Sequence, residues 1–108
     1  MVKRVLFVCG KNRLRSPTAE QVFADWPGVE VASAGLSADA DEPMSDELAE
    51  WADLVFVMEK AQRSRLARRF GPRLKRACIV CLDIADRYAF MDPELVRLLS
   101  ERVPPHLR

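Results

Sequence analysis

The sequence predicts an α/β fold, a three-layer αβα sandwich with a four-stranded parallel sheet. Short apolar runs rich in Val, Leu and Phe alternate along the chain with segments that have helical spacing. Strict alternation of this kind is typical of a parallel sheet covered by helices on both faces. The length of 108 residues, of which 49% are hydrophobic, fits a single domain over residues 1–108 with a core of its own.

The first half of the chain is expected to form two strands and two helices. The first apolar run predicts a buried strand. The helix after it has apolar residues at helical spacing and stops at Pro27-Gly28. A serine caps the second helix, and the two acidic residues after it suit a first helical turn. The expected elements are strand Lys3–Cys9, helix Pro17–Trp26, strand Val29–Ala34, loop Leu36–Pro43 and a helix from Ser45 to Trp51.

The second half continues the alternation. A basic helix ends at Gly71-Pro72, and Asp92-Pro93 opens the last helix, with aspartate as the N-cap and proline at the first helical position. Ligands bind such sheets at the carboxyl ends of the strands, near the point where the strand order reverses. The loop after Cys9 is therefore the first candidate for a site. The remaining expected elements are strand Asp53–Met58, helix Lys60–Phe70, strand Ala77–Leu82, loop Asp83–Met91 and the final helix.

The loop after the first strand has the pattern Cys-x5-Arg-Ser. Five intervening residues let the backbone curl so that successive N–H groups point inward and form a nest for an anion. The helix behind the loop adds its positive end. Gly10 and Asn12 are residue types that tolerate unusual backbone angles. The sequence therefore predicts a phosphate-binding loop after the first strand, made of Gly10, Lys11, Asn12, Arg13, Leu14, Arg15 and Ser16.

Cys9 and Arg15 give this loop its expected chemistry. Arg15 can hold a phosphate through two parallel hydrogen bonds, which lysine cannot match. The donors around Cys9 favour its thiolate, and Ser16 can donate to the sulfur or cap the helix. A thiolate inside a phosphate nest can attack phosphorus in line. Taken singly, Cys9 could be an inert thiol and Arg15 a surface charge. The position of the motif between an apolar strand and a proline-led helix favours catalysis.

The segment VLFVCGKNRLRSPTAE resembles the opening of the low-molecular-weight protein tyrosine phosphatase family. The likeness continues through Ser33-Ala34-Gly35 and through residues 52–58, which read ADLVFVM. The resemblance implies a hydrolase of phosphate monoesters, with phosphotyrosine in proteins as the expected substrate and no cofactor or metal. It also implies a phosphocysteine intermediate, in which Cys9 attacks and Arg15 holds the phosphate.

The chain departs from the family pattern at three places. The family usually has glycine directly before the loop asparagine, where this chain has Lys11, and it often has a second loop cysteine, where this chain has Leu14. The segment between Gly35 and Trp51 is much shorter than is typical, although in the family this region helps to form the wall of the substrate cleft. The sequence therefore leaves the choice of substrate open.

Cleavage of a phosphate ester needs an acid that protonates the leaving oxygen and then acts as a base toward water. Three aspartates follow the last strand. Asp83 can simply end the strand, and Asp92 can be a helix N-cap, although Asp92-Pro93 resembles the acid motif of the family. Asp86 lies in the loop where the family places its acid. We expect Asp86 to be the acid, with Asp92 as the alternative. Tyr88 is expected either to flank the substrate cleft or to pack the loop.

Charge is unevenly distributed along the chain. Residues 60–76 hold eight basic and no acidic side chains, although the net charge of the whole chain is only +1. The segment is either a solvated helix face or a patch that attracts an acidic partner or a phosphorylated substrate. Nucleic-acid binding is not expected because no aromatic residue beyond Phe70 is interleaved with these charges.

Composition also bears on location and metal binding. No apolar run approaches the roughly 18 residues of a membrane span, and the run from Val5 to Cys9 is too short for a secretory signal. We therefore expect a cytoplasmic protein without membrane contact. An odd count of three cysteines argues against a disulfide framework. One histidine, His106, and two further cysteines cannot complete a tetrahedral site, so no metal is expected.

Two other functions could use the same loop. An arsenate reductase shares this fold and motif but needs two more cysteines to relay a disulfide, and Cys78 and Cys81 are the candidates. Their offset of three along a strand places them on opposite faces, and cysteines in such a strand are usually small buried hydrophobes. The second alternative is a phosphate-binding or phospho-carrier domain that does not hydrolyse its ligand. If Asp86 can reach the pocket, hydrolysis is favoured over the carrier.

Overall fold

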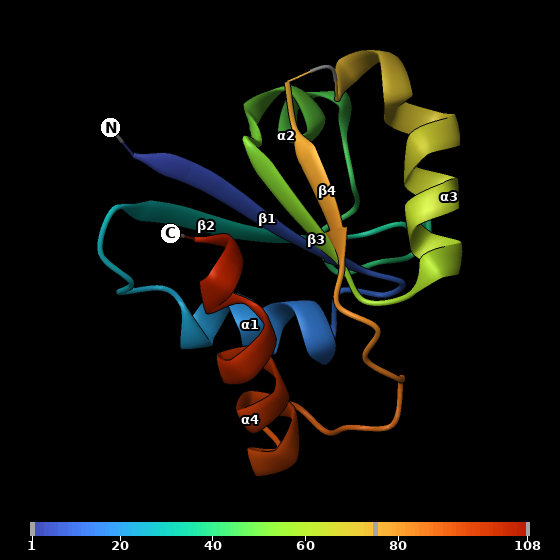
Figure 1. Cartoon of the computed structure of the whole chain (residues 1–108). Coiled ribbons are helices and arrows are strands. Elements are labelled where there is room, and N and C mark those ends of the chain that lie inside the picture. Colours follow the sequence, from blue (N-terminus) through green and yellow to red (C-terminus); the bar gives the residue numbers. More distant parts are fainter. Residues whose placement is uncertain (1, 75, 108) are drawn as a thin grey trace.

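The computed structural model describes every residue except Met1, Lys75 and Arg108, so one of the eight basic residues in segment 60–76 lies outside the described residues. Four parallel strands form one sheet in the order β2-β1-β3-β4. Helices α1 and α4 cover one face of this sheet, and α2 and α3 cover the other (Figure 1). The predicted three-layer αβα sandwich is confirmed. Its elements are β1 Lys3–Cys9, α1 Arg15–Val22, β2 Val29–Gly35, α2 Asp46–Trp51, β3 Leu54–Val57, α3 Lys60–Phe70, β4 Cys78–Cys81 and α4 Pro93–Arg102.

The core consists of two apolar layers, one on each side of the central strands β1 and β3. Successive side chains of a strand point to opposite faces, so an all-apolar strand serves both layers. On the side of α1 and α4, the ring of Phe7 stacks on Phe23 and Phe56 with centroid distances of 5.9 and 5.4 Å. On the side of α3, Leu66 and Phe70 pack against the alternate residues of the same strands. Rigid central strands therefore fix the position of the loops that follow them.

Two helix starts follow their expected signals. The Ser45 hydroxyl accepts the N–H of Leu48 at 3.1 Å and caps α2. Asp92 caps α4 through the N–H of Glu94 at 2.9 Å, with proline at the first helical position. Helix α3 has the expected bounds, but the chain continues from Gly71 into a short 3-10 turn instead of a left-handed glycine cap.

Helix α1 differs from its prediction at both ends. It begins at Arg15, two residues early, and Ser16 lies inside it rather than capping it because its hydroxyl bonds Cys9 and Asn12. It ends at Val22, and the chain then turns through residues 23–25 before it reaches Pro27. Trp26 therefore lies outside the helix and is 40% exposed.

Strand β4 is an edge strand, and the expectation that its cysteines are buried is wrong. Cys78 is exposed and Cys81 is half-buried, because β4 has a neighbour on one side only. Ile79 and Cys81 pack on the α2 and α3 side while Val80 packs on the other. The predicted placement of Cys78 and Cys81 on opposite faces therefore holds. Within the described part of the chain no helix could span a membrane, since even α3 has only 11 residues.

Candidate active site

The carboxyl ends of β1 and β3 meet at one edge of the sheet, where the strand order reverses. Register places Val8 beside Val57, so the residues that follow each strand share this edge. From there α1 runs along one face and α3 along the other (Figure 1). The loops that follow β1 and β3 leave a space between them. Ligands of open parallel sheets bind in such a space.

Cys9 ends β1 and is buried, with 3% of its surface exposed. Its sulfur lies 2.9 Å from the Ser16 hydroxyl oxygen and accepts the backbone N–H of Asn12 at 3.2 Å. The Ser16 hydroxyl also lies 2.8 Å from the side-chain oxygen of Asn12. Asn12 has a φ of 55°, a left-handed conformation that asparagine tolerates. The loop therefore curls around the sulfur and directs donors toward it.

Gly35, at the end of β2, lets the neighbouring strand approach this loop closely. A Cβ on Gly35 would lie 2.5 Å from the Cβ of Ala40, 2.7 Å from the Gly10 oxygen and 3.0 Å from the Asn12 nitrogen. By contrast, Gly10 has no positive φ and a Cβ there would meet nothing within 4 Å. The expectation that Gly10 provides unusual backbone angles is therefore wrong. The loop needs glycine at position 35 instead, because backbone packs on backbone there.

Arg15 is the buried cation of the site, with 4% of its surface exposed. Its Nη1 donates to the backbone oxygen of Ile84 at 2.7 Å and lies 3.5 Å from the carboxylate of Glu59. Its Nε lies 3.6 Å from the carboxylate of Asp86. A charge this deeply buried needs such partners to offset the loss of water. The contacts also fix the plane of the guanidinium group.

One cavity of about 250 Å³ brings the expected nucleophile, arginine and acid together. The side chain of Asp86 stays 63% exposed, so it lies at the rim, while Arg15 lies at the base. Asn12 and Ser16 support the loop from behind and are not part of this lining. The cavity is lined by Cys9, Gly10, Lys11, Arg13, Leu14, Arg15 and Asp86.

Comparison with known proteins places this geometry in a family. The family model for low molecular weight phosphotyrosine protein phosphatases matches residues 4–52, which run from β1 to the end of α2 and contain the whole phosphate loop. The arginine phosphatase YwlE from Geobacillus stearothermophilus superposes with a TM-score of 0.76 at 25% identity, over 97% of this chain and 92% of that one. The first half of the chain matches the low-molecular-weight phosphatase family, and the whole chain is similar in fold to phosphatases of known structure. The expectation that the chain is a phosphoric monoester hydrolase of the protein-tyrosine-phosphatase type is confirmed by these matches.

Further solved structures share the fold at lower identity. Wzb from Vibrio vulnificus, solved with benzylphosphonate, has a TM-score of 0.76 at 23% identity, over 94% of each chain. The tyrosine phosphatase AmsI from Erwinia amylovora has a TM-score of 0.73 at 24% identity, over 94% of this chain and 89% of that one. No match is found among curated protein sequences. The fold of this chain is thus more widely shared than its sequence.

Tyr88 and Asp92 do not line the cavity of this phosphatase. The ring of Tyr88 is buried in the core on the α1 and α4 side, with 9% of its surface exposed. The guanidinium of Arg87 covers the ring at 5.3 Å and donates to its hydroxyl at 3.3 Å. The structure therefore gives Tyr88 the loop-packing role rather than a position in the substrate cleft. The Asp92 carboxylate caps α4, as described above.

The short segment after β2 braces the phosphate loop. Its backbone N–H groups at 36, 37 and 41 donate to the oxygens of residues 9, 10 and 11 at 2.9 to 3.1 Å. Lys11 pairs with Asp39 at 2.7 Å, and Arg13 pairs with Asp41 at 3.1 Å. Hydrogen bonds from Lys11 and then from Ser37 lower the pKa of Asp39 to about 2. Asp39 therefore stays ionised at neutral pH and keeps Lys11 beside the loop.

The loop that carries Asp86 is held at both ends. Arg102 of α4 donates to the backbone oxygens of Leu82 and Asp83, both at 2.9 Å. At the other end, the Thr18 hydroxyl of α1 accepts the N–H of Met91 at 2.9 Å. Arg15 holds the loop between these points through Ile84. The loop is therefore a fixed wall of the cavity.

Sequence reasoning missed Gly35, Glu59 and Arg102 as parts of the site. Glu59 could have been found, because it follows an apolar strand by two residues and so lies at the same sheet edge as Cys9. The carbonyl of Ile84 offers no such signal, because every residue has one. Among the residues that the structure describes, no three His, Cys, Asp or Glu side chains form a group that could hold a metal ion.

Proposed function

We propose that this chain hydrolyses phosphotyrosine in proteins through a phosphocysteine intermediate. The observation that carries the proposal is the single cavity in which the Cys9 sulfur, the buried Arg15 and the Asp86 carboxylate meet. Leu14, which is 39% exposed, adds apolar surface beside the cavity for an aromatic ring. The phosphate group enters the curled loop, and the tyrosine ring remains toward the rim.

The first step transfers the phosphoryl group to sulfur. The Cys9 thiolate forms a bond to phosphorus while the bond from phosphorus to the phenolic oxygen breaks. Asp86 in its acid form gives its proton to that oxygen, so tyrosine leaves as the neutral phenol. Arg15 and the backbone N–H groups of the loop stabilise the charge on the equatorial oxygens.

The second step returns the enzyme to its starting state. Water attacks the phosphorus and gives a proton to the Asp86 carboxylate, the bond from phosphorus to sulfur breaks, and phosphate and the thiolate are released. The Ser16 hydroxyl lies 2.9 Å from the sulfur and stabilises the thiolate as it leaves. Asp86 therefore acts as acid in the first step and as base in the second.

The two alternatives receive less support from the geometry. Cys78 and Cys81 lie on opposite faces of an edge strand, and neither lines the cavity, so a disulfide relay to Cys9 has no direct path. Asp86 reaches Arg15, which favours hydrolysis over simple phosphate binding or transfer. A phosphoarginine substrate is a second candidate, because the superposed YwlE structure is named as an arginine phosphatase.

The test of this proposal measures phosphate release from phosphotyrosine and phosphoarginine peptides, with Cys9→Ser and Cys78→Ser as a matched pair. Cys9→Ser should abolish turnover and still bind vanadate, and Cys78→Ser should keep full activity. Arsenate reduction that is lost in Cys78→Ser would support the reductase instead. Turnover by Cys9→Ser at the wild-type rate would overturn the mechanism, and faster release from phosphoarginine would correct the substrate.

A further inference from the structure

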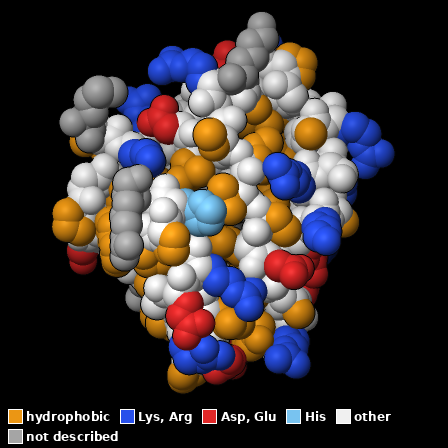
Figure 2. Space-filling model, in the orientation of Figure 1, with side chains coloured by type: hydrophobic (Ala, Val, Ile, Leu, Met, Phe, Trp, Pro, Cys, Tyr) orange, Lys and Arg blue, Asp and Glu red, His pale blue; other side chains and the backbone are white. Residues whose placement is uncertain are grey.

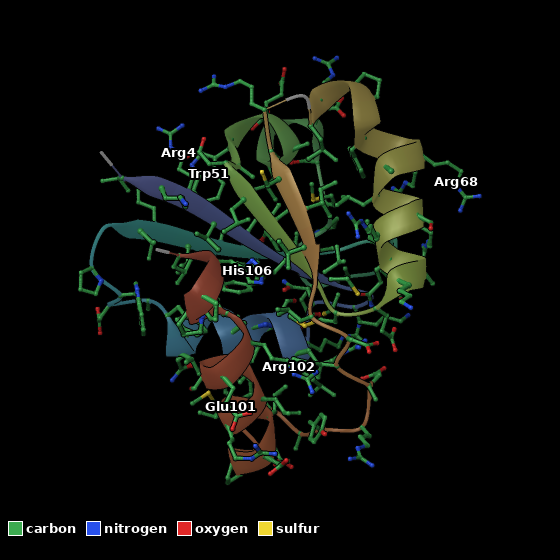
Figure 3. The ribbon with its side chains drawn as sticks, in the orientation of Figure 1. Arg4, Trp51, Arg68, Glu101, Arg102 and His106 are labelled. Atoms are coloured by element: carbon green, nitrogen blue, oxygen red, sulfur yellow. The ribbon has the colours of Figure 1, made fainter. Side chains whose placement is uncertain are left out.

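Helix α3 carries a set of exposed cations. The buried residues of the helix, Gln62, Leu66 and Phe70, recur at every fourth position and face the core. Figure 3 shows Arg68 pointing away from the body of the protein, and Figure 2 shows basic side chains along this side of the molecule. We use the name basic face of α3 for the exposed residues Lys60, Arg63, Arg65 and Arg68.

These four cations have no carboxylate partner among the residues that the structure describes. Across the described residues, none of them forms an ion pair, whereas Lys11, Arg13, Arg73 and Arg97 each have a carboxylate within 4.0 Å. Arg69 of the same helix is different, because it donates to the backbone oxygen of Leu36 at 2.6 Å and lies over Phe70. The contacts of Arg69 therefore explain its place in the fold, whereas the basic face of α3 is available to bind a partner.

The basic face begins at the catalytic edge of the sheet. Lys60 directly follows Glu59, whose carboxylate lies 3.5 Å from Nη1 of Arg15. From residue 60 to residue 68 the helix rises about 12 Å, at 1.5 Å per residue. An extended peptide of about four residues covers that length. A chain that places one side chain in the cavity can therefore lie along α3 with the residues beside it.

We infer that the basic face of α3 docks an acidic segment of the phosphoprotein substrate, next to the phosphorylated residue. The inference rests on the proposed function, and it names the substrate class more closely. Charge complementarity selects an acidic occupant, because no carboxylate of the helix interrupts the basic face. Its location beside the catalytic edge selects the substrate itself over an unrelated partner.

Other polyanions fit this face less well. Single-stranded nucleic acid binds through bases that stack on aromatic side chains, and the single aromatic residue of α3, Phe70, is buried. A membrane surface binds helices that expose large apolar residues beside their charges. Here Leu66 and Phe70 are in the core. An acidic polypeptide needs only the exposed cations that the helix offers.

The test compares three substrates at low ionic strength. They are p-nitrophenyl phosphate, a phosphotyrosine peptide flanked by four glutamates, and the same peptide flanked by four glutamines. For the wild-type enzyme we expect kcat/KM to be about tenfold higher for the glutamate peptide, the lower end of electrostatic steering effects. The ratio should fall toward one at high salt, because exposed charges are screened over about 3 Å in 1 M salt.

A matched pair of double variants locates the effect. Arg65→Glu/Arg68→Glu removes the preference for the glutamate peptide and leaves p-nitrophenyl phosphate turnover unchanged. Arg4→Glu/Arg76→Glu changes the net charge equally, at exposed positions near the opposite edge of the sheet, and should keep the preference. Circular dichroism and the melting temperature check folding, and Arg65→Gln/Arg68→Gln repeats the test if the glutamate variant is unstable.

Binding separates this inference from the proposed function. Cys9→Ser should bind the glutamate peptide more tightly than the glutamine peptide in fluorescence anisotropy, whether or not wild type turns either over. Equal affinity for both peptides would overturn the docking surface, as would a preference that survives in Arg65→Glu/Arg68→Glu. Tighter binding of a single-stranded oligonucleotide that this variant abolishes would assign the face to nucleic acid and refute the peptide. Failure of wild type on all three substrates would refute the proposed function alone.

Discussion

Asp86 and Asp92 show how neighbouring residues of one type take different roles. The Asp92 carboxylate accepts the N–H of Glu94, which accounts for its presence at the start of α4. Asp86 is not used in this way and lies at the cavity rim, 3.6 Å from Nε of Arg15. This position beside the buried arginine supports the acid role that we propose for Asp86.

We expect Asp86→Asn to slow hydrolysis according to the leaving group. Loss of a general acid costs roughly 10²- to 10⁴-fold in rate, and the full cost should apply to phosphotyrosine, because tyrosine leaves poorly without a proton. The loss should be smaller for p-nitrophenyl phosphate. The pH–rate profile should also lose one of its two limbs.

Asp92→Asn is the matched control for this measurement. Asparagine caps helices about as well as aspartate, so both the rate and the melting temperature should stay close to wild type. Asp92→Ala should lower the free energy of unfolding by about 1 kcal/mol with little kinetic effect. A collapse of rate that depends on the leaving group in Asp92→Asn, and not in Asp86→Asn, would exchange the two roles.

Gly35→Ala should impair both the fold and the phosphate loop. The new methyl group would lie 2.7 Å from the Gly10 oxygen and 3.0 Å from the Asn12 nitrogen, so the loop must shift. Overpacking of this kind costs about 1–3 kcal/mol, and a shift near 1 Å at a catalytic loop can cost about 10²-fold in rate. Denaturant unfolding and kcat/KM for p-nitrophenyl phosphate measure the two effects.

Gly71→Ala provides the comparison for this glycine. Its φ is −48° and a Cβ there meets nothing within 4 Å. The substitution should leave the rate unchanged and be neutral or stabilising by about 0.4–1 kcal/mol, because alanine restricts the unfolded chain. Equal effects of the two substitutions would contradict the close packing inferred at Gly35.

At the scale of elements, the best predicted features depend on nearby residues. The bounds of β1 and α3 follow from local apolar patterns, and the caps at Ser45 and Asp92 follow from side chains beside them. Features that depend on strand order were missed. The exposure of Cys78 follows from the edge position of β4, and a list of elements does not contain the order of the strands.

The candidate site also has one part that the sequence predicts and one part that it does not. The motif from Cys9 to Ser16 is contiguous, so its spacing already predicts the nest for phosphate. The partners of Arg15 come from residues 59, 84 and 86, which only the folded sheet brings together. The burial of Tyr88 likewise depends on α1 and α4, which form the core around its ring. Sequence spacing therefore predicts the phosphate loop but not the contacts that position it.

A substitution of Arg102 tests whether α4 positions the loop that carries Asp86. Its two hydrogen bonds to Leu82 and Asp83 bridge the end of β4 and the start of the loop. Arg102→Gln should reduce phosphotyrosine hydrolysis more than p-nitrophenyl phosphate hydrolysis, because a displaced Asp86 delivers its proton poorly. A loss that is equal for both substrates would show that Arg102 supports the fold without positioning the acid.

Arg97→Gln is the control from the same helix. Arg97 pairs with Glu94 and Glu101 on the exposed side of α4 and makes no contact with the loop among the described residues. Exposed pairs of this kind contribute about 0–1 kcal/mol. Arg97→Gln should therefore lower the melting temperature slightly and leave the ratio of the two rates unchanged.

At the scale of the whole molecule, the cavity connects elements from across the sequence. Cys9 belongs to β1 and Arg15 to α1, while Asp86 comes from the loop between β4 and α4. Glu59 adds the start of α3 through its contact with Arg15. Unfolding separates these elements, so the unfolded chain has no cradle for an anion. A ligand of the cavity should consequently stabilise the entire fold.

Vanadate should raise the melting temperature of the wild-type protein. A ligand that binds only the folded state stabilises it by about 2.7 kcal/mol at 100 times its Kd. For a domain of this size that corresponds to an increase of about 10 °C. Differential scanning calorimetry over a vanadate series measures the shift, and sulfate gives a second tetrahedral anion for comparison.

Arg15→Lys should abolish most of this shift, because lysine keeps the charge but loses the planar pair of donors. Arg13→Lys makes the same exchange at the cavity rim, where the side chain is 52% exposed and paired with Asp41, and it should keep most of the shift. The comparison therefore separates the effect of the planar donor pair of Arg15 from the effect of the general positive charge of the loop. An undiminished shift in Arg15→Lys would show that vanadate is held by the loop backbone alone, and Arg15 would lose its assigned role as the phosphate grip.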